Sequence, residues 1–261
     1  MARAPHPSVK TRMRPLHLLF LVFAMALPLG AAAQQITVSA AASLTDAFKA
    51  LAPKFEATKP GATVRFNFAA SGVLLQQIAQ GAPVDVFASA DQETMGRAAD
   101  QKLIDAATRR NFAGNALVLI EPLRDATGIR SLQDLAGAGV RKIAVGKTAT
   151  VPVGRYTRQV LEGAGLWSVL EPKFVQADSV RQVLDYVARG EVEAGFVYRT
   201  DAAVMGDKVR VAFAPATAMP VSYPVAVVAD SRQKALAGDF VAFLSSDSAR
   251  EVLARYGFGS P

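Results

Sequence analysis

The sequence predicts an α/β protein of mostly parallel strands, divided into two domains. Short runs rich in β-branched residues alternate with segments whose apolar residues recur every three or four positions, over almost the whole chain after residue 35. Two strand-like runs, one followed by a proline and one containing two prolines, have the character of crossings between domains. About 228 residues follow the first 33, and at roughly 150 residues per domain this length allows one large or two small domains.

The β-branched runs predict nine strands, and amphipathic helices fill the intervals between them. The strands are expected over residues 36–40, 63–68, 85–89, 116–121, 142–146, 172–176, 193–198, 209–213 and 222–228. The clearest helical stripes are Leu44, Ala47, Phe48, Leu51 and Phe55 in one interval and Val180, Val183, Leu184 and Val187 in another. We therefore expect each domain to hold a mostly parallel sheet flanked by helices.

Two crossings set the expected domain boundaries. The first is the run 115–121, which precedes Pro122, and the second is the run 219–228. If the chain leaves one domain at the first crossing and returns at the second, residues 35–115 and 222–261 form lobe I and residues 116–221 form lobe II. Ligand sites in such folds lie at the carboxyl ends of strands and between domains.

The first 33 residues (1–33) have the composition of a cleavable secretory signal peptide. Four basic residues precede a short apolar stretch at 18–30, and residues 31–33 are alanines that suit cleavage. The stretch is shorter than the roughly 20 residues of a membrane span. The chain has no cysteine for a lipid anchor, and Met13 separates Arg12 from Arg14, so the leader has no twin-arginine signal. We expect a soluble, monomeric protein exported to the periplasm.

The composition excludes several classes of function. Both histidines, His6 and His17, lie in the leader, so the mature chain has no histidine or cysteine for a nucleophile system, a zinc site or a disulfide. Removing the four basic residues of the leader lowers the formal net charge from +7 to +3, so nucleic acid is not an expected partner. Enzymes that use only carboxylates or lysine remain open.

Ser43 and Ser71 each follow a predicted strand and begin a helical segment. A serine at a helix N-cap leaves a hydroxyl and unpaired backbone N–H groups at the positive end of the helix dipole. That is the geometry of an anion site.

Two further helix starts resemble the serine pair. Pro152 suits a first helical turn, and Asp178 is expected to cap the helix that follows it, so the N–H groups of Val153 and Val180 should be free. Tyr198, at the end of the strand 193–198, adds a hydroxyl. If all these groups face one cleft, they form a site rich in neutral donors.

Charged residues near these helix starts have other expected roles. Arg155 and Arg181 each lie one turn inside a helix, where we expect them to be solvated or paired with a carboxylate. Asp85, Asp91 and Asp134 are expected to be strand-edge or cap residues, with no spacing that suggests a metal.

Six segments of the chain, together with the closing residues 255–258, show a family resemblance. They are AAASLT at 40–45, FAAS at 68–71, GAPVDVFASAD at 81–91, VPVG at 151–154, VY at 197–198 and YPVAVV at 223–228. They resemble the periplasmic molybdate-binding proteins of ABC importers, and the likeness covers nearly the whole mature chain.

The resemblance implies a two-lobed periplasmic binding protein fold of type II that holds tetrahedral molybdate or tungstate through hydroxyls and backbone amides alone. The matching positions are Ser43 and Ser71 in one lobe and Val153, Val180 and Tyr198 in the other. Val153 stands where alanine is common, and Gly72 stands where some members have another serine. The resemblance implies no catalytic residue, no cofactor and no direct metal ligand.

The expected function is capture of molybdate or tungstate and delivery to a membrane permease. The alternatives are a binder of another anion, such as sulfate or an organic acid, and a carboxylate-based enzyme on the same fold. An organic acid site should use an arginine for a bidentate grip, and the five matched positions include none. An enzyme should have paired carboxylates near the helix starts. The candidate carboxylate there, Asp178, is better explained as a helix cap.

Overall fold

The computed structural model describes residues 1, 2, 4, 5 and 34–261. The predicted signal peptide therefore lies almost entirely outside the described residues. Residues 34–261 belong to one compact unit that holds two five-stranded sheets. Among the described helices, none combines the length and apolar character needed to cross a membrane.

The first sheet has the strand order β2-β1-β3-β10-β4. These strands are β1 (Gln34–Ala41), β2 (Ala62–Ala69), β3 (Val86–Ala88), β4 (Arg110–Asn115) and β10 (Val221–Val227). Strand β1 is parallel to β2 and β3, whereas β10 is antiparallel to β3 and β4. Four strands thus run in one direction, and β10 alone is reversed.

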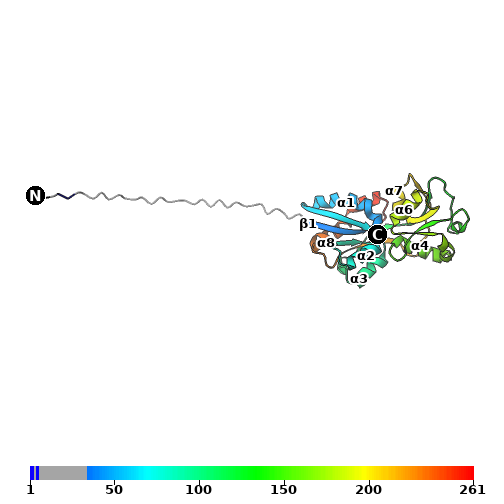
Figure 1. Ribbon diagram of the computed structural model, residues 1–261, viewed down its shortest axis with the longest axis horizontal. Coiled ribbons are helices and arrows are strands. Elements are labelled where there is room, and N and C mark those ends of the chain that lie inside the picture. Colours follow the sequence, from blue (N-terminus) through cyan, green and yellow to red (C-terminus); the bar gives the residue numbers. More distant parts are fainter. Residues whose placement is uncertain (3, 6–33) are drawn as a thin grey trace. The chain divides into compact units, whose positions relative to one another are not determined.

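Helices cover both faces of this sheet, because its strands alternate between two apolar clusters. Val86 and Ala88 pack in the cluster that contains residues of α1 (Thr45–Thr58), α8 (Lys234–Phe243) and α9 (Asp247–Arg255). Phe87 packs in the other cluster, with residues of α2 (Ser71–Ala79) and α3 (Gln92–Asp100). Figure 1 shows β1 and the helices α1, α2, α3 and α8 grouped in one half of the compact unit.

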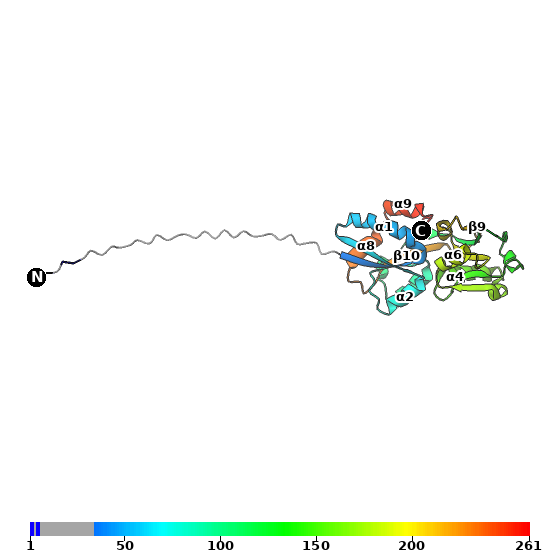
Figure 2. The ribbon, with the colours of Figure 1, turned by 45° about the horizontal axis from the view of Figure 1, so that its top comes forward.

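The second sheet has the order β7-β6-β8-β5-β9. Its strands are β5 (Leu117–Pro122), β6 (Ile143–Gly146), β7 (Phe174–Ala177), β8 (Ala194–Tyr198) and β9 (Val209–Phe213). Strand β6 is parallel to β7 and β8, and β5 is antiparallel to β8 and β9. Its principal helices are α4 (Pro152–Gly163), α6 (Val180–Ala188) and α7 (Arg199–Val204), with the short α5 (Trp167–Leu170) beside α4. Figure 2 shows α4 and α6 together with this sheet.

The predicted two-lobed α/β fold with mostly parallel sheets is confirmed, and all nine predicted strands are present within a few residues. Strands β5 and β10, the reversed member of each sheet, coincide with the two runs expected to be crossings. Short 3-10 turns complete the connections, at Ala42–Leu44, Ala106–Thr108, Gln133–Ala136 and Glu171–Lys173. The prediction missed β4, which pairs with β10 and carries no β-branched residue.

Candidate functional site

The helix starts singled out in the sequence converge on one small cavity between the two lobes. All five predicted site residues line it, together with six small or apolar neighbours; the full lining is Ala41, Ala42, Ser43, Ala70, Ser71, Ala90, Val151, Pro152, Val153, Val180 and Tyr198. None of these side chains carries a charge. The cavity volume is about 10 Å³, far below the roughly 300–1,000 Å³ of sites for drug-sized organic ligands.

The two serines line the cavity, although they are not the N-caps that the sequence suggested. Ser43 lies inside the 3-10 turn Ala42–Leu44, and Ser71 is the first residue of α2, whose N-cap is Ala70. Neither hydroxyl caps its own helix, because each has a distant partner. Ser71 Oγ accepts a hydrogen bond from the Ala90 N–H at 3.0 Å, and Ser43 Oγ lies 3.0 Å from the Tyr223 hydroxyl.

Val153 and Val180 present backbone donors at the starts of α4 and α6. Pro152 is the first residue of α4, as expected, so Val153 follows in the first turn. Val180 is the first residue of α6. First-turn N–H groups have no carbonyl one turn earlier in the helix. Both valines are buried and line the cavity, so a ligand there can use these N–H groups.

The expected cap of α6 was one residue off. Ser179 is the N-cap, and its hydroxyl accepts from the Gln182 N–H at 3.2 Å. Asp178 instead forms an exposed ion pair with Lys147 at 2.5 Å. The serine occupies the extended cap conformation while the aspartate reaches the lysine, so no carboxylate faces the cavity.

Tyr198 extends from the end of β8 into the contact between the lobes. The residue is 1% exposed, and its hydroxyl donates to the Ala90 carbonyl at 3.4 Å. Burial raises the pKa of Tyr198 well above its usual value, so the phenol stays a donor. The hydrogen bond is long for an O–H donor, and the hydroxyl can turn toward an anion in the cavity.

Two glycines allow α4 to start against the end of β6. A Cβ on Gly154 would lie 2.0 Å from the Gly146 carbonyl oxygen, and the backbone of β6 cannot move away without disturbing the sheet. This close approach brings the first turn of α4, with Val153, to the cavity.

We expect Gly154→Ala to lower the free energy of unfolding by at least about 2 kcal/mol, because it overpacks this contact. The control is Gly163→Ala at the other end of α4, where a Cβ meets nothing within 4 Å. That change should be neutral or stabilise by up to about 1 kcal/mol. Urea unfolding measures both, and equal stability of the two variants would contradict the packing role of Gly154.

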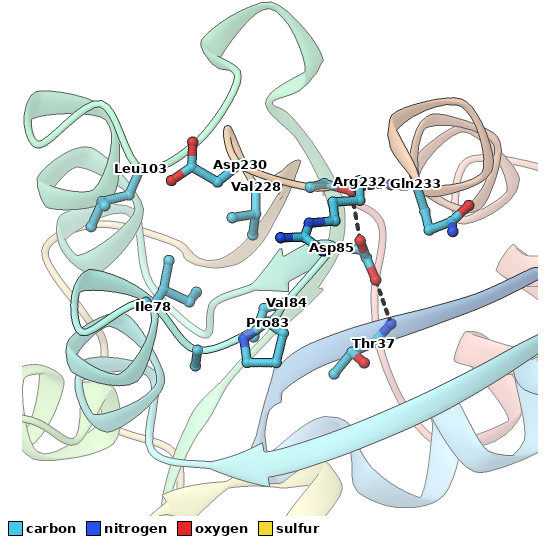
Figure 3. Close-up of a pocket in the computed structure, with 13 residues that line it drawn as sticks. Thr37, Ile78, Pro83, Val84, Asp85, Leu103, Val228, Asp230, Arg232 and Gln233 are labelled. Carbon is cyan, nitrogen blue, oxygen red and sulfur yellow. Dashed lines mark hydrogen bonds between the residues drawn. The ribbon is translucent and has the colours of Figure 1, made fainter.

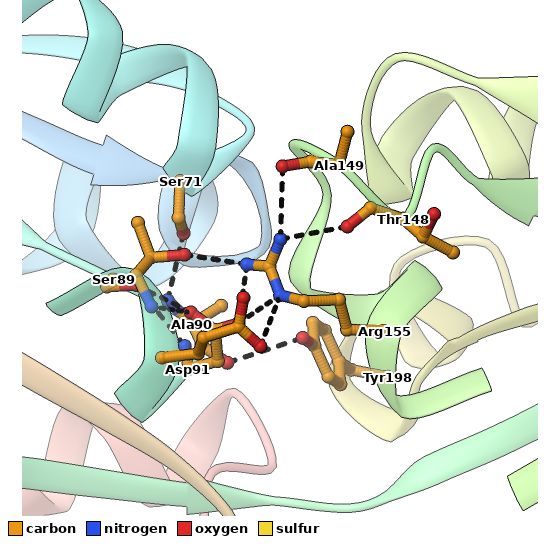
Figure 4. A network of polar contacts seen from close by, with 10 residues as sticks. Ser71, Ser89, Ala90, Asp91, Thr148, Ala149, Arg155 and Tyr198 are labelled. Carbon is orange, nitrogen blue, oxygen red and sulfur yellow. Dashed lines mark hydrogen bonds and ion pairs between the residues drawn. The ribbon is translucent and has the colours of Figure 1, made fainter. Parts of the chain in front are cut away.

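Arg155 joins the lobes through a nearly buried ion pair with Asp91 (Figure 4). Its Nη2 lies 2.5 Å from Asp91 Oδ2 and donates to Thr94 Oγ1 at 2.6 Å, and its Nη1 donates to the Thr148 carbonyl at 3.1 Å. The two side chains of the pair are 10% and 5% exposed. The expectation of a carboxylate partner is confirmed, and Arg155 holds a structural anion outside the cavity.

Arg181 makes a second connection between the lobes. It lies 2.8 Å from Asp46 of α1 and 2.7 Å from Asp201 of α7, again as expected for a paired arginine. Burial raises the pKa of Asp201 to about 6, against the lowering effect of Arg181. Both arginines thus neutralise carboxylates at the lobe contact and leave the cavity to neutral donors.

Gly72 explains one departure from the family pattern. Its N–H donates to the Thr150 carbonyl of the other lobe at 2.9 Å. A Cβ at this position would lie 2.7 Å from the Thr150 backbone. In this arrangement of the lobes, the position has room for glycine and not for a serine.

A separate cavity lies beside Thr37 of β1 and residues 81–85, which precede β3 (Figure 3). Asp85 is a half-buried acidic group in its lining, and its oxygens accept from the Thr37 N–H at 2.8 Å and the Ser231 hydroxyl at 2.6 Å. Asp85 therefore has a structural role at the strand edge, as the sequence predicted. Within residues 34–261, no group of three or more His, Cys, Asp or Glu is placed to hold a metal ion.

Comparison with known proteins places the chain among transport proteins. The profile of the family described as bacterial extracellular solute-binding protein matches residues 36–259. Molybdate-binding protein ModA of Escherichia coli K12 is 41% identical over 231 residues, which are 86% of this chain and 88% of the relative.

Solved structures agree with this placement. The substrate-binding domain of a putative molybdenum ABC transporter from Clostridium difficile has a TM-score of 0.66 at 35% identity, covering 87% of this chain and 99% of that chain. The sulfate-binding protein SubI from Mycobacterium tuberculosis H37Rv has a TM-score of 0.77 at 19% identity, covering 86% of each chain. At that identity the second likeness establishes the fold alone.

Proposed function

Because this chain belongs to the family of bacterial extracellular solute-binding proteins, we propose that it captures molybdate, or tungstate, in the cavity between its lobes. It then delivers the anion to the membrane permease of an ABC transporter. The observation that carries the proposal is the convergence of Ser43, Ser71, Val153, Val180 and Tyr198 on one cavity with an uncharged lining. The names of the E. coli and C. difficile relatives support molybdate as the anion.

A shell of neutral donors suits a doubly charged oxyanion. The hydroxyls of Ser43, Ser71 and Tyr198 and the N–H groups of Val153 and Val180 supply directed donors, each charge-assisted bond contributing roughly 1.5–3 kcal/mol net. Fixed dipoles also leave the ligand free to depart when the lobes open, which a buried cation would oppose. The protein on this proposal is a monomeric carrier that needs neither cofactor nor catalytic residue.

The lobes and the leader have defined parts in this proposal. Residues 35–115 with 222–261 form lobe I, residues 116–221 form lobe II, and the two lobes close on the anion. Residues 1–33 are the cleavable signal peptide that exports the chain to the periplasm, where the permease is reached.

Selectivity among oxyanions tests the proposal. We expect tight, comparable binding of molybdate and tungstate, weak or absent binding of sulfate, and no binding of phosphate. Near pH 7 phosphate keeps a proton, and a shell of donors gives that O–H no acceptor, which costs about 1–3 kcal/mol or more. Sulfate is smaller and cannot reach every donor at once. Native mass spectrometry with each anion, followed by competition titration, measures the order.

Sulfate is the second candidate ligand, since the fold also occurs in a sulfate-binding protein. If sulfate displaced molybdate at similar concentrations, the molybdate assignment would be wrong and the sulfate alternative would replace it.

A further inference from the structure

We propose that Asn115 and Tyr223 are positioning residues that turn the Ser43 hydroxyl proton into the cavity, so that Ser43 can only donate to the bound oxyanion. The inference rests on the proposed function, and it assigns a role to two residues outside the cavity lining. It follows from the direction of three consecutive hydrogen bonds.

Tyr223 is fully buried and has two polar neighbours among the described residues. Its hydroxyl lies 3.0 Å from Ser43 Oγ and 3.1 Å from Asn115 Nδ2. Its ring packs against Phe112, Tyr198 and Phe258, with centroid distances of 6.3, 5.8 and 5.4 Å. Aromatic rings surround the phenol, so its single proton goes to one of the two polar neighbours.

The backbone fixes the orientation of the Asn115 amide. Oδ1 accepts from the Ala116 N–H at 2.9 Å, and Nδ2 donates to Thr200 Oγ1 at 2.9 Å as well as to Tyr223. Turning the amide over would place its NH₂ group against the Ala116 N–H and leave two donors facing each other. Asn115 is therefore a donor to Tyr223.

The remaining bonds then have one direction. Because the Tyr223 oxygen accepts from Asn115, its own O–H donates to Ser43 Oγ. Burial raises the pKa of Tyr223 well above its usual value, so this proton stays on the phenol. Ser43 Oγ accepts from Tyr223 and makes no other hydrogen bond with the described residues. Its own proton is left for the cavity that it lines.

The arrangement removes an unfavourable state of the site. A serine hydroxyl without a fixed partner can rotate and present its lone pairs to an anion, and the lone pairs then repel the anion. With Tyr223 donating to Ser43, the three donors point the same way, and each bond polarises the next. We call the chain of hydrogen bonds from Asn115 through Tyr223 to Ser43 the relay. Asn115 ends β4, next to the crossing into β5, and also contacts Thr200 of α7, so the relay starts where the two lobes join.

A double-mutant cycle on molybdate affinity tests this relay. Tyr223→Phe should weaken molybdate binding about 10-fold, since it removes the bond that orients Ser43. In combination with Ser43→Ala, the same change should matter less than about 2-fold, because the hydroxyl it orients is gone. Tyr186→Phe, which deletes a tyrosine hydroxyl bonded to Gln182 on α6, is the matched control and should leave affinity unchanged.

A purely structural role for Tyr223 predicts a different result. Tyr223→Phe would then lower molybdate affinity by the same factor in the wild-type and Ser43→Ala backgrounds. Such additive losses would overturn the relay while the proposed function stands. Failure of the wild-type protein to bind molybdate in the same calorimetric titration would overturn the proposed function, and this inference with it.

A second cycle does not depend on the folding of the Tyr223→Phe variant. Asn115→Asp keeps the side-chain shape and an acceptor for the Ala116 N–H, but its carboxylate accepts the Tyr223 proton and reverses the relay. We expect a loss larger than that of Tyr223→Phe, most of which disappears in combination with Ser43→Ala. An Asn115→Asp loss that is equal in both backgrounds would come from the added charge alone and would overturn the relay.

Discussion

Asp91→Asn should weaken molybdate binding about 100-fold while the protein remains folded. The ion pair between Asp91 and Arg155 is nearly buried at the lobe contact, and breaking such a pair costs about 3–5 kcal/mol because the remaining charge is left uncompensated. Opening of the lobes returns the guanidinium to water, so the cost falls on the closed form. The substitution keeps the cap of α3, since an amide oxygen can still accept from the Thr94 N–H.

Calorimetry and X-ray scattering together check this result. The wild-type radius of gyration should fall when molybdate is added, because closure of the lobes completes the donor shell. The Asp91→Asn variant should need far more molybdate for the same change. Asp178→Asn is the matched control: its ion pair with Lys147 is exposed and lies within one lobe, so affinity should change less than about 2-fold. If the two variants bound molybdate with equal affinity, the ion pair between Asp91 and Arg155 would not stabilise the closed form.

Most of the fold could be predicted because its signals are local. Nine strands and the core stripe of α6 follow from periodicity. The runs 115–121 and 219–228, which were singled out by their prolines, coincide with the reversed strands β5 and β10. Strand β4 could not be found this way, since Arg110–Asn115 is held by pairing with β10 and by the bridge from Gly114 to Gly259 near the chain end. Those partners lie more than 100 residues away, and no local pattern encodes them.

The five candidate residues were predictable because each stands at a junction of strand and helix, and topology gathers such junctions at one edge of a sheet. Details that depend on which of several side chains takes a given hydrogen-bond partner could not be predicted. Ser179 and Asp178 are adjacent cap-forming residues, and the choice depends on Lys147 engaging the aspartate. The partners of the serines escaped prediction as well, because Tyr223 is 180 residues from Ser43 and the Ala90 N–H is a backbone group without a sequence signature.

Ser71→Ala should cost more affinity than any other single hydroxyl deletion at the site. Ser71 Oγ accepts from the Ala90 N–H, so its own proton is free for the anion. Removing the hydroxyl deletes one bond to a charged ligand, worth roughly 1.5–3 kcal/mol, and leaves the Ala90 N–H unpaired in the closed form. The two losses together predict at least about 100-fold weaker molybdate binding.

Val153→Ala is the control that separates side-chain donors from backbone donors. Its assigned donor is the main-chain N–H at the start of α4, which alanine retains, so affinity should change only a few-fold despite the loss of two buried methyl groups. Calorimetric titration of both variants measures the difference. If Val153→Ala weakened molybdate binding more than Ser71→Ala, the site would depend on the apolar wall of the cavity, and the assignment of the serine hydroxyls as ligand donors would fall.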